Sequence, residues 1–295
     1  MFLRQFQYLI ALEQEGHFGR AADRCYVSQP SLSSAIKKLE EELGIPIILR
    51  DQKFRGFTLE GERVVEWAKR LLADRAAMLE DLAIMQKSLH GRLRIGAMPT
   101  SSPMLPIVAR QFQKHYPSVQ VDIQFMGIDQ LKLSLKNFEL DIGITDLDQL
   151  SDTRLETLAL YEEPLYLLLP NNDWLDDRPE VTWADAAKLP LCLLSQTMRE
   201  RQMMDEAFAL VNCEPEPQLV SNSIFQLAFH VMAGDLATIV PRRFTELPGT
   251  RDKLLINPIL KQKLGLAWVK GNPILPMAKA TIELLSKAVE DGAFE

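Results

Sequence analysis

The feature that most constrains the fold of this chain is a pair of short helical segments joined by a tight turn, ahead of residue 45. Ser28 offers a hydroxyl that can cap a helix, and Pro30 stands in the first turn, where a missing N–H costs little. The helix that follows ends at Gly44, and its apolar positions recur at helical spacing: Leu32, Ile36, Leu39 and Leu43. This pattern predicts a helix-turn-helix unit.

A further helix precedes this pair. Apolar residues from Phe2 to Leu12 recur at helical spacing, and Gly16 is expected to end that helix. Gly19 is the expected cap of the next helix, in which Ala21 and Ala22 are small enough to let two helices approach closely. We therefore expect a three-helix unit.

The face of the third helix opposite its apolar stripe carries hydroxyl, amide and ammonium groups. These groups can reach base edges and phosphates in DNA. The candidate residues are Ser28, Gln29, Pro30, Ser31, Ser33, Ser34, Lys37 and Lys38. The alternative is an ordinary solvated helix face, and the three-helix context favours the DNA-binding interpretation.

Residues 45–61, IPIILRDQKFRGFTLEG, follow the third helix. An apolar β-prone run, a charged tip and a second short strand predict a β-hairpin wing. Arg50, Lys53 and Arg55 would then contact phosphates.

Net charge permits DNA binding without demonstrating it. The chain carries a formal charge of −7. Residues 1–90 hold 13 basic and 13 acidic residues, so the acidity belongs wholly to residues 91–295, with 20 basic and 27 acidic. A DNA-binding unit is often basic, and this one is neutral.

The stretch AADRCYVSQPSLSSAIKKLEEELGIPIILR resembles the signature of the LysR family, usually written AAxxLxxSQPxxSxxIxxLExxLGxxLFxR. The matching positions are Ala21, Ala22, Ser28, Gln29, Pro30, Ser33, Ile36, Leu39, Glu40, Leu43, Gly44 and Arg50. The chain departs from the pattern at Cys25, where the family favours Leu, and at Ile47–Ile48, where it favours Leu-Phe. Ser34 stands where many relatives carry Arg. The resemblance implies a winged helix-turn-helix regulator that binds double-stranded promoter DNA, answers to a small-molecule effector and affects RNA polymerase.

A long helix without Gly or Pro is predicted from Gly61 to about Leu89. Its heptad-like seam is Val64, Ala68, Leu71, Arg75, Met78, Leu82, Met85 and Leu89. A core helix of a monomer can show the same stripe, but we expect a dimerising linker, which the family resemblance also implies, within a homodimer or homotetramer.

The remaining residues alternate between apolar strands and amphipathic helices. This alternation predicts an α/β fold with a parallel sheet covered on both faces. It resembles the LysR effector domain, which has the fold of periplasmic binding proteins with two Rossmann-like lobes. We expect a winged helix-turn-helix over 1–59, a linker helix over 60–90 and an effector domain over 91–295. Lobe I would comprise 91–162 and 265–295, and lobe II would comprise 163–264, with the PLYLLLP segment near 164–170 and the KLGLAWV segment near 263–269 crossing between them.

Ligands of such folds bind where strands end and helices begin, because free N–H groups there favour anions. The polar residues expected at these places suit a carboxylate or a similarly small anion, although each could be a simple helix cap. The candidate effector site comprises Thr100, Ser101, Ser102, Met126, Gly127, Thr145, Ser195, Gln196, Thr197, Asn222, Ser223 and Ile224.

Other functions lack sequence support. No nucleophile elbow, phosphate-binding loop or dinucleotide loop is present, so we expect no enzyme activity and no cofactor. Three cysteines and four histidines show no metal-ligand spacing. A redox switch through Cys192 and Cys213 is the alternative trigger. No apolar run is long enough to span a membrane, and the N-terminus lacks a signal-peptide pattern, so we expect a cytoplasmic protein.

Overall fold

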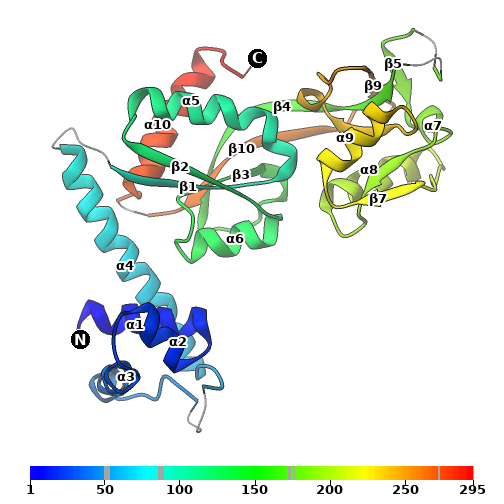
Figure 1. Ribbon diagram of the computed structural model, residues 1–295. Helices are drawn as coiled ribbons and strands as arrows, with labels where there is room; N and C mark the ends of the chain where they lie inside the picture. Colours follow the sequence, from blue (N-terminus) through cyan, green and yellow to red (C-terminus); the bar gives the residue numbers. More distant parts are fainter. Residues whose placement is uncertain (50–53, 86–89, 172–173, 176, 272, 295) are drawn as a thin grey trace. The chain divides into compact units, whose positions relative to one another are not determined.

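The computed structural model describes all residues except 50–53, 86–89, 172–173, 176, 272 and 295 (Figure 1). The chain divides into two compact units, one built on Met1–His90 and the other on Gly91–Leu135 and Leu140–Glu295. Each unit has its own hydrophobic core. Among the described residues, no helix combines the length and apolar character needed to cross a membrane.

The first unit contains the three predicted helices and the start of the long one. They are α1 (Leu3–Glu15), α2 (Phe18–Arg24), α3 (Gln29–Leu43) and α4 (Leu59–Met85). Gly16 and Gly44 end α1 and α3 in the left-handed conformation, with φ of 59° and 70°. The Ser28 hydroxyl caps α3 by accepting from the Ser31 N–H at 3.3 Å, as the sequence predicted.

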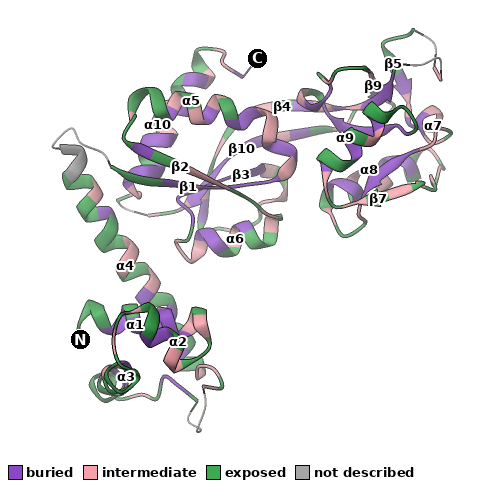
Figure 2. Ribbon diagram, viewed as in Figure 1, coloured by how far each residue is buried: buried purple, intermediate pink, exposed green. Residues whose placement is uncertain are grey.

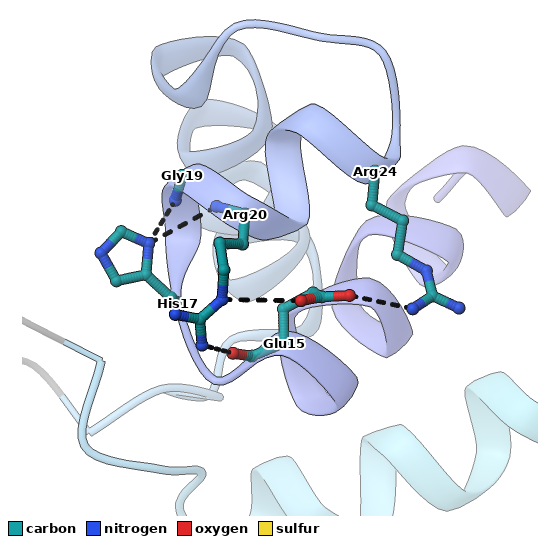
Figure 3. A network of polar contacts seen from close by, with 5 residues as sticks. All are labelled: Glu15, His17, Gly19, Arg20 and Arg24. Carbon is teal, nitrogen blue, oxygen red and sulfur yellow. Dashed lines mark hydrogen bonds and ion pairs between the residues drawn. The ribbon is translucent and has the colours of Figure 1, made fainter.

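The cap of α2 is His17 rather than the predicted Gly19. The imidazole Nδ1 of His17 accepts from the backbone N–H groups of Gly19 at 3.0 Å and Arg20 at 3.4 Å (Figure 3). The Glu15 carboxylate at the end of α1 binds Arg24 at 2.9 Å and Arg20 at 3.6 Å on α2. The junction between α1 and α2 is therefore held by side chains, and the small residue at 19 leaves room for the imidazole.

The core of the first unit matches the predicted apolar face except at its end. Leu32, Ile36 and Leu39 of α3 are at most 1% exposed, whereas Leu43 is 37% exposed. Glu40 is buried instead, and its carboxylate accepts from the backbone N–H groups of Ile47 at 2.8 Å and Ile48 at 3.2 Å. In the last turn of α3 the buried side chain is therefore the Glu40 carboxylate rather than Leu43, and it binds the segment that follows the helix.

The predicted wing is present as a narrow antiparallel pairing. Ile48 and Phe57 form an isolated bridge, and the Leu49 N–H donates to the Gly56 carbonyl at 3.1 Å. Phe54 packs edge-to-face on Phe57 and on Phe18 of α2, which anchors the wing to the helices. The predicted tip residues 50 and 53 lie outside the described residues.

The long helix α4 divides its apolar face between two environments. Ala68 of the predicted seam is buried in the core of the first unit and Val64 packs against that core, so the first part of the seam serves the chain's own core. Farther along, Leu71, Met78 and Leu82 are 38%, 56% and 50% exposed. Residues 85 and 89, the last two of the predicted seam, have side chains outside the part of the chain that the structure describes. The exposed apolar stripe therefore begins only at Leu71.

The second unit is an α/β structure of two lobes, which confirms the predicted fold class. In the first lobe β1 pairs in parallel with β2 and β3, and β10 closes the sheet antiparallel to β3. Its elements are β1 (Gly91–Ala97), η1 (Pro99–Met104), α5 (Leu105–His115), β2 (Val119–Phe125), α6 (Ile128–Lys136), β3 (Ile142–Asp146), η2 (Leu147–Gln149), β10 (Lys261–Val269) and α10 (Pro276–Glu290).

The second lobe is built on smaller sheets. A mixed group pairs β8 and β9 with β4, and β6 pairs in parallel with β7. Its elements are β5 (Glu180–Thr182), α7 (Trp183–Ala186), β6 (Cys192–Leu194), α8 (Arg199–Leu210), β7 (Leu219–Ser221), α9 (Ile224–Ala233), β8 (Thr238–Pro241), η3 (Arg242–Phe244) and β9 (Thr250–Ile256).

One strand, β4 (Leu155–Pro170), belongs to both lobes (Figure 1). Residues 155–164 pair with β10, and residues 165–170 pair with β8 and β9. The strand begins well before the predicted PLYLLLP segment, because its first half alternates buried and exposed residues and so lacks a continuous apolar run. Both β4 and β10 run antiparallel to the strands that they pair with, so the sheet is mixed rather than wholly parallel (Figure 2 shows its buried centre).

Removing the Glu40 carboxylate should destabilise the first unit by about 2 kcal/mol, because two buried backbone donors lose a charged acceptor. Glu40→Ala in the full-length protein should accelerate hydrogen exchange throughout residues 1–60. Glu41→Ala, which removes an exposed carboxylate from the same turn, is the control. Equal exchange in both variants would contradict this role for Glu40.

Candidate functional site

The polar face of α3 is exposed along its length, as the DNA-binding interpretation requires. All eight candidate residues from Ser28 to Lys38 are exposed, while the opposite face fills the core. Ser28 and Ser31 share a hydrogen bond of 2.8 Å between their hydroxyls, which orders the first turn. Lys37 lies 3.8 Å from Glu41, and its side chain is 64% exposed. Such an exposed ion pair is weak, so Lys37 can exchange it for a phosphate.

The wing adds one described basic residue to this surface. Arg55 is exposed beside Phe54, which packs on α2. Arg50 and Lys53 fall outside the described residues. The helix and the wing together present hydroxyls, an amide and cations on one unit whose total charge is zero.

The candidate effector residues of the first lobe gather where β1 and β3 end side by side. Thr100, Ser101 and Thr145 are at most 2% exposed. The Ser101 hydroxyl donates to the Met98 carbonyl at 2.7 Å, and the Thr145 hydroxyl donates to the Met98 sulfur at 2.8 Å. These two hydroxyls therefore already have local acceptors.

The other first-lobe candidates lie nearer the surface. The half-buried Ser102 donates its hydroxyl to the Pro99 carbonyl at 2.6 Å. Met126 and Gly127 follow β2, as predicted, with the Met126 N–H bound to the Ala97 carbonyl at 3.0 Å. The Gly127 carbonyl accepts the first backbone hydrogen bond of α6, from Leu131.

In the second lobe, the parallel pairing of β6 and β7 brings two predicted segments to one end. The Ser195 N–H donates to the Ser221 carbonyl at 2.9 Å, and Gln196 and Thr197 are exposed in the same turn. Asn222 is exposed, and the Ser223 hydroxyl caps α9 by accepting from Gln226 at 3.4 Å. The Ile224 side chain is 1% exposed and packs in the core of this lobe.

Two buried carboxylates between the lobes were not predicted. Glu200, in the first turn of α8, accepts from the Thr100 hydroxyl of the first lobe at 3.5 Å. Burial raises the pKa of Glu200, and the nearby Asp146 raises it further. The pKa of Asp146, at the end of β3, is also raised by burial, although Gln149 and the Asp148 N–H donate to its carboxylate.

The cation next to Glu200 along the helix does not neutralise it. Arg201 is 3% exposed, and its guanidinium binds the Leu194 carbonyl at 2.8 Å and Asp205 at 2.7 Å. We call Thr100, Thr145, Asp146 and Glu200 the interlobe site. Glu200 sits in a polar helical run, RERQ, whose sequence gives no sign that one carboxylate points inward.

The environment of Cys192 opposes redox chemistry there. Its side chain is fully buried in β6, its Sγ donates to the Leu227 carbonyl at 3.7 Å, and burial raises its pKa to about 11. The thiolate is the nucleophilic form, so this thiol is protected. Cys213 is half-buried, and both thiols are free. Among the described residues, no cluster of three His, Cys, Asp or Glu side chains could hold a metal ion.

A winged helix-turn-helix with an exposed polar recognition helix, joined to a two-lobed α/β unit, defines a helix-turn-helix regulatory protein with a separate ligand-binding domain. Residues 3–62 match the family described as "Bacterial regulatory helix-turn-helix protein, lysR family", and residues 86–290 match "LysR substrate binding domain". The chain belongs to the LysR family and is a LysR-type transcriptional regulator; this family consists of regulators, not enzymes.

Full-length relatives support the same assignment. The chain is 30% identical to the DNA-binding transcriptional dual regulator OxyR of Escherichia coli, covering all of this chain and 98% of the relative. It is 33% identical to a hydrogen peroxide-inducible genes activator of Haemophilus influenzae, covering 99% and 97%. A full-length OxyR variant from Pseudomonas aeruginosa superposes with a TM-score of 0.75 at 28% identity, covering 98% and 95%.

Glu200→Gln should stabilise the second unit at neutral pH and flatten its pH dependence. Because burial raises the folded-state pKa, the folded protein keeps this proton where the unfolded chain has lost it. The contribution of this carboxyl to the free energy of unfolding is therefore greatest below the ordinary glutamate pKa of about 4.3, and it falls as the pH rises through the folded-state pKa.

Calorimetric unfolding of the full-length protein between about pH 4 and pH 8 measures this dependence. Glu206→Gln, on the exposed side of the same helix, should leave the profile unchanged. If the stability of Glu200→Gln changes with pH in the same way as that of the wild type, the ionised Glu200 carboxylate does not destabilise the fold as predicted.

Proposed function

We propose that this regulator binds double-stranded promoter DNA through α3 and the wing, and changes transcription when a small molecule binds between the two lobes. The observation that carries the DNA-binding part is the division of α3 into a buried apolar face and an exposed face of hydroxyl, amide and ammonium groups. DNA binding implies work in the cytoplasm, next to RNA polymerase.

The proposed surface divides its work by chemistry. Gln29, at the start of α3, can pair with a base edge through its amide, while Lys37, Lys38 and the wing cations Arg50, Lys53 and Arg55 bind phosphates. The domain limits we propose remain 1–59, 60–90 and 91–295, with the second lobe over 163–264.

We propose that the protein acts as a homodimer through α4 and assembles further into a tetramer. Leu71, Met78 and Leu82 form an exposed apolar stripe at helical spacing, beyond the part of α4 that packs in the first unit. A second copy of the same stripe would bury it, and the dimer would carry two recognition helices for two half-sites.

The effector proposal rests on the two lobes meeting at Thr100 and Glu200. A ligand there would contact residues from both lobes and so change the angle between them. The hydroxyls and helix starts suit the predicted anionic group. The two buried carboxylates suit a ligand that also donates hydrogen bonds, such as a small zwitterion.

The redox alternative through Cys192 and Cys213 draws on the names of the peroxide-responsive relatives, which describe those proteins. In this chain the buried, protonated Cys192 is a poor nucleophile. We therefore favour a bound effector over a disulfide as the trigger.

The DNA-binding proposal predicts different defects for two α3 residues. Lys37→Gln should weaken binding to all duplexes and reduce the slope of log K against log salt by about 0.9, because one phosphate contact is lost. Gln29→Ala should instead weaken selected sites by about 1–3 kcal/mol relative to random duplex. Fluorescence anisotropy of the full-length protein, with duplexes selected from a random library, measures both. Lys114→Gln, an exposed change in the second unit, is the control.

The effector proposal predicts that Thr100→Val separates sensing from DNA binding. A thermal-shift screen of the full-length protein against small metabolite anions, amines and zwitterions should find a ligand that raises the unfolding temperature. Thr100→Val should abolish that rise and leave DNA affinity unchanged. The exposed Thr157→Val should keep it. A Thr100→Val variant that keeps the full ligand shift would show that the ligand binds elsewhere.

A further inference from the structure

Tyr26 lies just after the end of α2, in a backbone conformation that glycine usually adopts. Its φ is +55°, in the left-handed region. The Tyr26 N–H donates to the Asp23 carbonyl at 3.1 Å, and the Val27 N–H donates to the Ala22 carbonyl at 3.0 Å. These two bonds form the Schellman pattern of a helix end, in which the left-handed residue is commonly Gly and sometimes Asn.

The turn itself is required by the packing of the first unit. Val27, the residue after Tyr26, packs against the core that contains Ala22, which is the apolar contact expected across such a helix end. The left-handed residue therefore directs Val27 inward. The backbone needs this conformation at position 26, but nothing in that geometry needs an aromatic side chain.

The Tyr26 side chain does not pack against the fold. It is 95% exposed, more than any other large hydrophobic side chain in the described part of the protein. A bulky residue is disfavoured in the left-handed region because its Cβ crowds the backbone, and an exposed ring buries no surface to offset that cost. The fold therefore gains nothing that Asn or Gly would not provide better.

Tyr26 lies close in sequence to the DNA-binding face proposed for α3. It lies two residues before Ser28, the cap of α3, and next to the exposed run Ser28, Gln29 and Pro30 at the start of that helix. In a helix-turn-helix protein the start of the recognition helix enters the major groove, between two phosphate backbones. Tyrosine hydroxyls are among the groups that contact phosphate oxygens.

We propose that Tyr26 is a DNA-backbone contact, with its phenol hydroxyl donating a hydrogen bond to a phosphate oxygen beside the site read by α3. This inference rests on the proposed DNA-binding function. The contact positions α3 in the groove, and because the phenol is neutral it releases no counterion.

Two variants of the full-length protein separate the role of the hydroxyl from the role of the backbone. Tyr26→Phe removes only the hydroxyl and should lower affinity by about 3- to 10-fold, for selected and random duplexes alike. Tyr26→Asn should lower affinity at least as much, yet raise the unfolding temperature of the first unit, because Asn accepts the left-handed conformation. In both variants the salt slope should equal that of the wild type, unlike in Lys37→Gln.

Asn212→Gly, at another left-handed position in the second unit, is the matched control and should leave DNA affinity unchanged. Wild-type affinity in Tyr26→Phe would overturn the phosphate contact. A lower unfolding temperature in Tyr26→Asn would overturn the claim that the fold does not need the ring. A wild-type protein that retains no duplex from the library would overturn the proposed function itself, which distinguishes that failure from the failure of this inference.

Discussion

The shared strand β4 is the constraint on which the second unit depends. Its first half is hydrogen-bonded to β10 in one lobe, and its second half is hydrogen-bonded to β8 and β9 in the other. Neither lobe can rotate without bending the residues where the partners change, between Tyr161 and Leu165. Glu163 lies in this segment, and its buried carboxylate accepts from the Arg243 N–H at 3.1 Å and from the Tyr161 hydroxyl at 3.3 Å. The segment in which β4 changes partners is therefore held in place by specific hydrogen bonds.

The interlobe site lies far along the chain from the segment where β4 changes partners, and its charges affect the contact between the lobes. Glu200 and Asp146 come from opposite lobes, and each pKa is raised by burial. When both are ionised, their repulsion opposes the contact between lobes, and a proton or a donor group on a ligand relieves it. A ligand that donates hydrogen bonds to both carboxylates would therefore favour contact between the lobes. On the proposed function, this electrostatic balance would couple effector binding to the angle between the lobes.

The sequence predicted the elements whose signals are local and missed those that depend on tertiary context. The cap at Ser28 and the glycine ends of α1 and α3 were predictable because each follows from the chemistry of one or two residues. The cap by His17 was missed because an imidazole acceptor is not a common cap. Glu40 and Glu200 were missed because a charged residue in a polar helical run reads as solvated, and only the packed structure shows that each is buried. The start of β4 was missed because an alternating strand at a lobe junction lacks the apolar run of a central strand.

The neutrality of the first unit limits how a single copy can bind DNA. Non-specific affinity grows with the number of phosphates that lysine and arginine neutralise, and this unit has equal numbers of acidic and basic residues. Part of its basic charge is engaged internally, as in the pairs of Arg24 with Glu15 and Lys69 with Glu13. One recognition helix would therefore hold DNA weakly. In the dimer that we propose, two units joined through α4 would make the second contact intramolecular, which raises the effective concentration of the second helix at its half-site. In such a dimer the exposed stripe of Leu71, Met78 and Leu82 would matter for DNA affinity as well as for assembly. On this proposal, neutral contacts that need no counterion release would carry a larger share of DNA binding than they do in a basic domain.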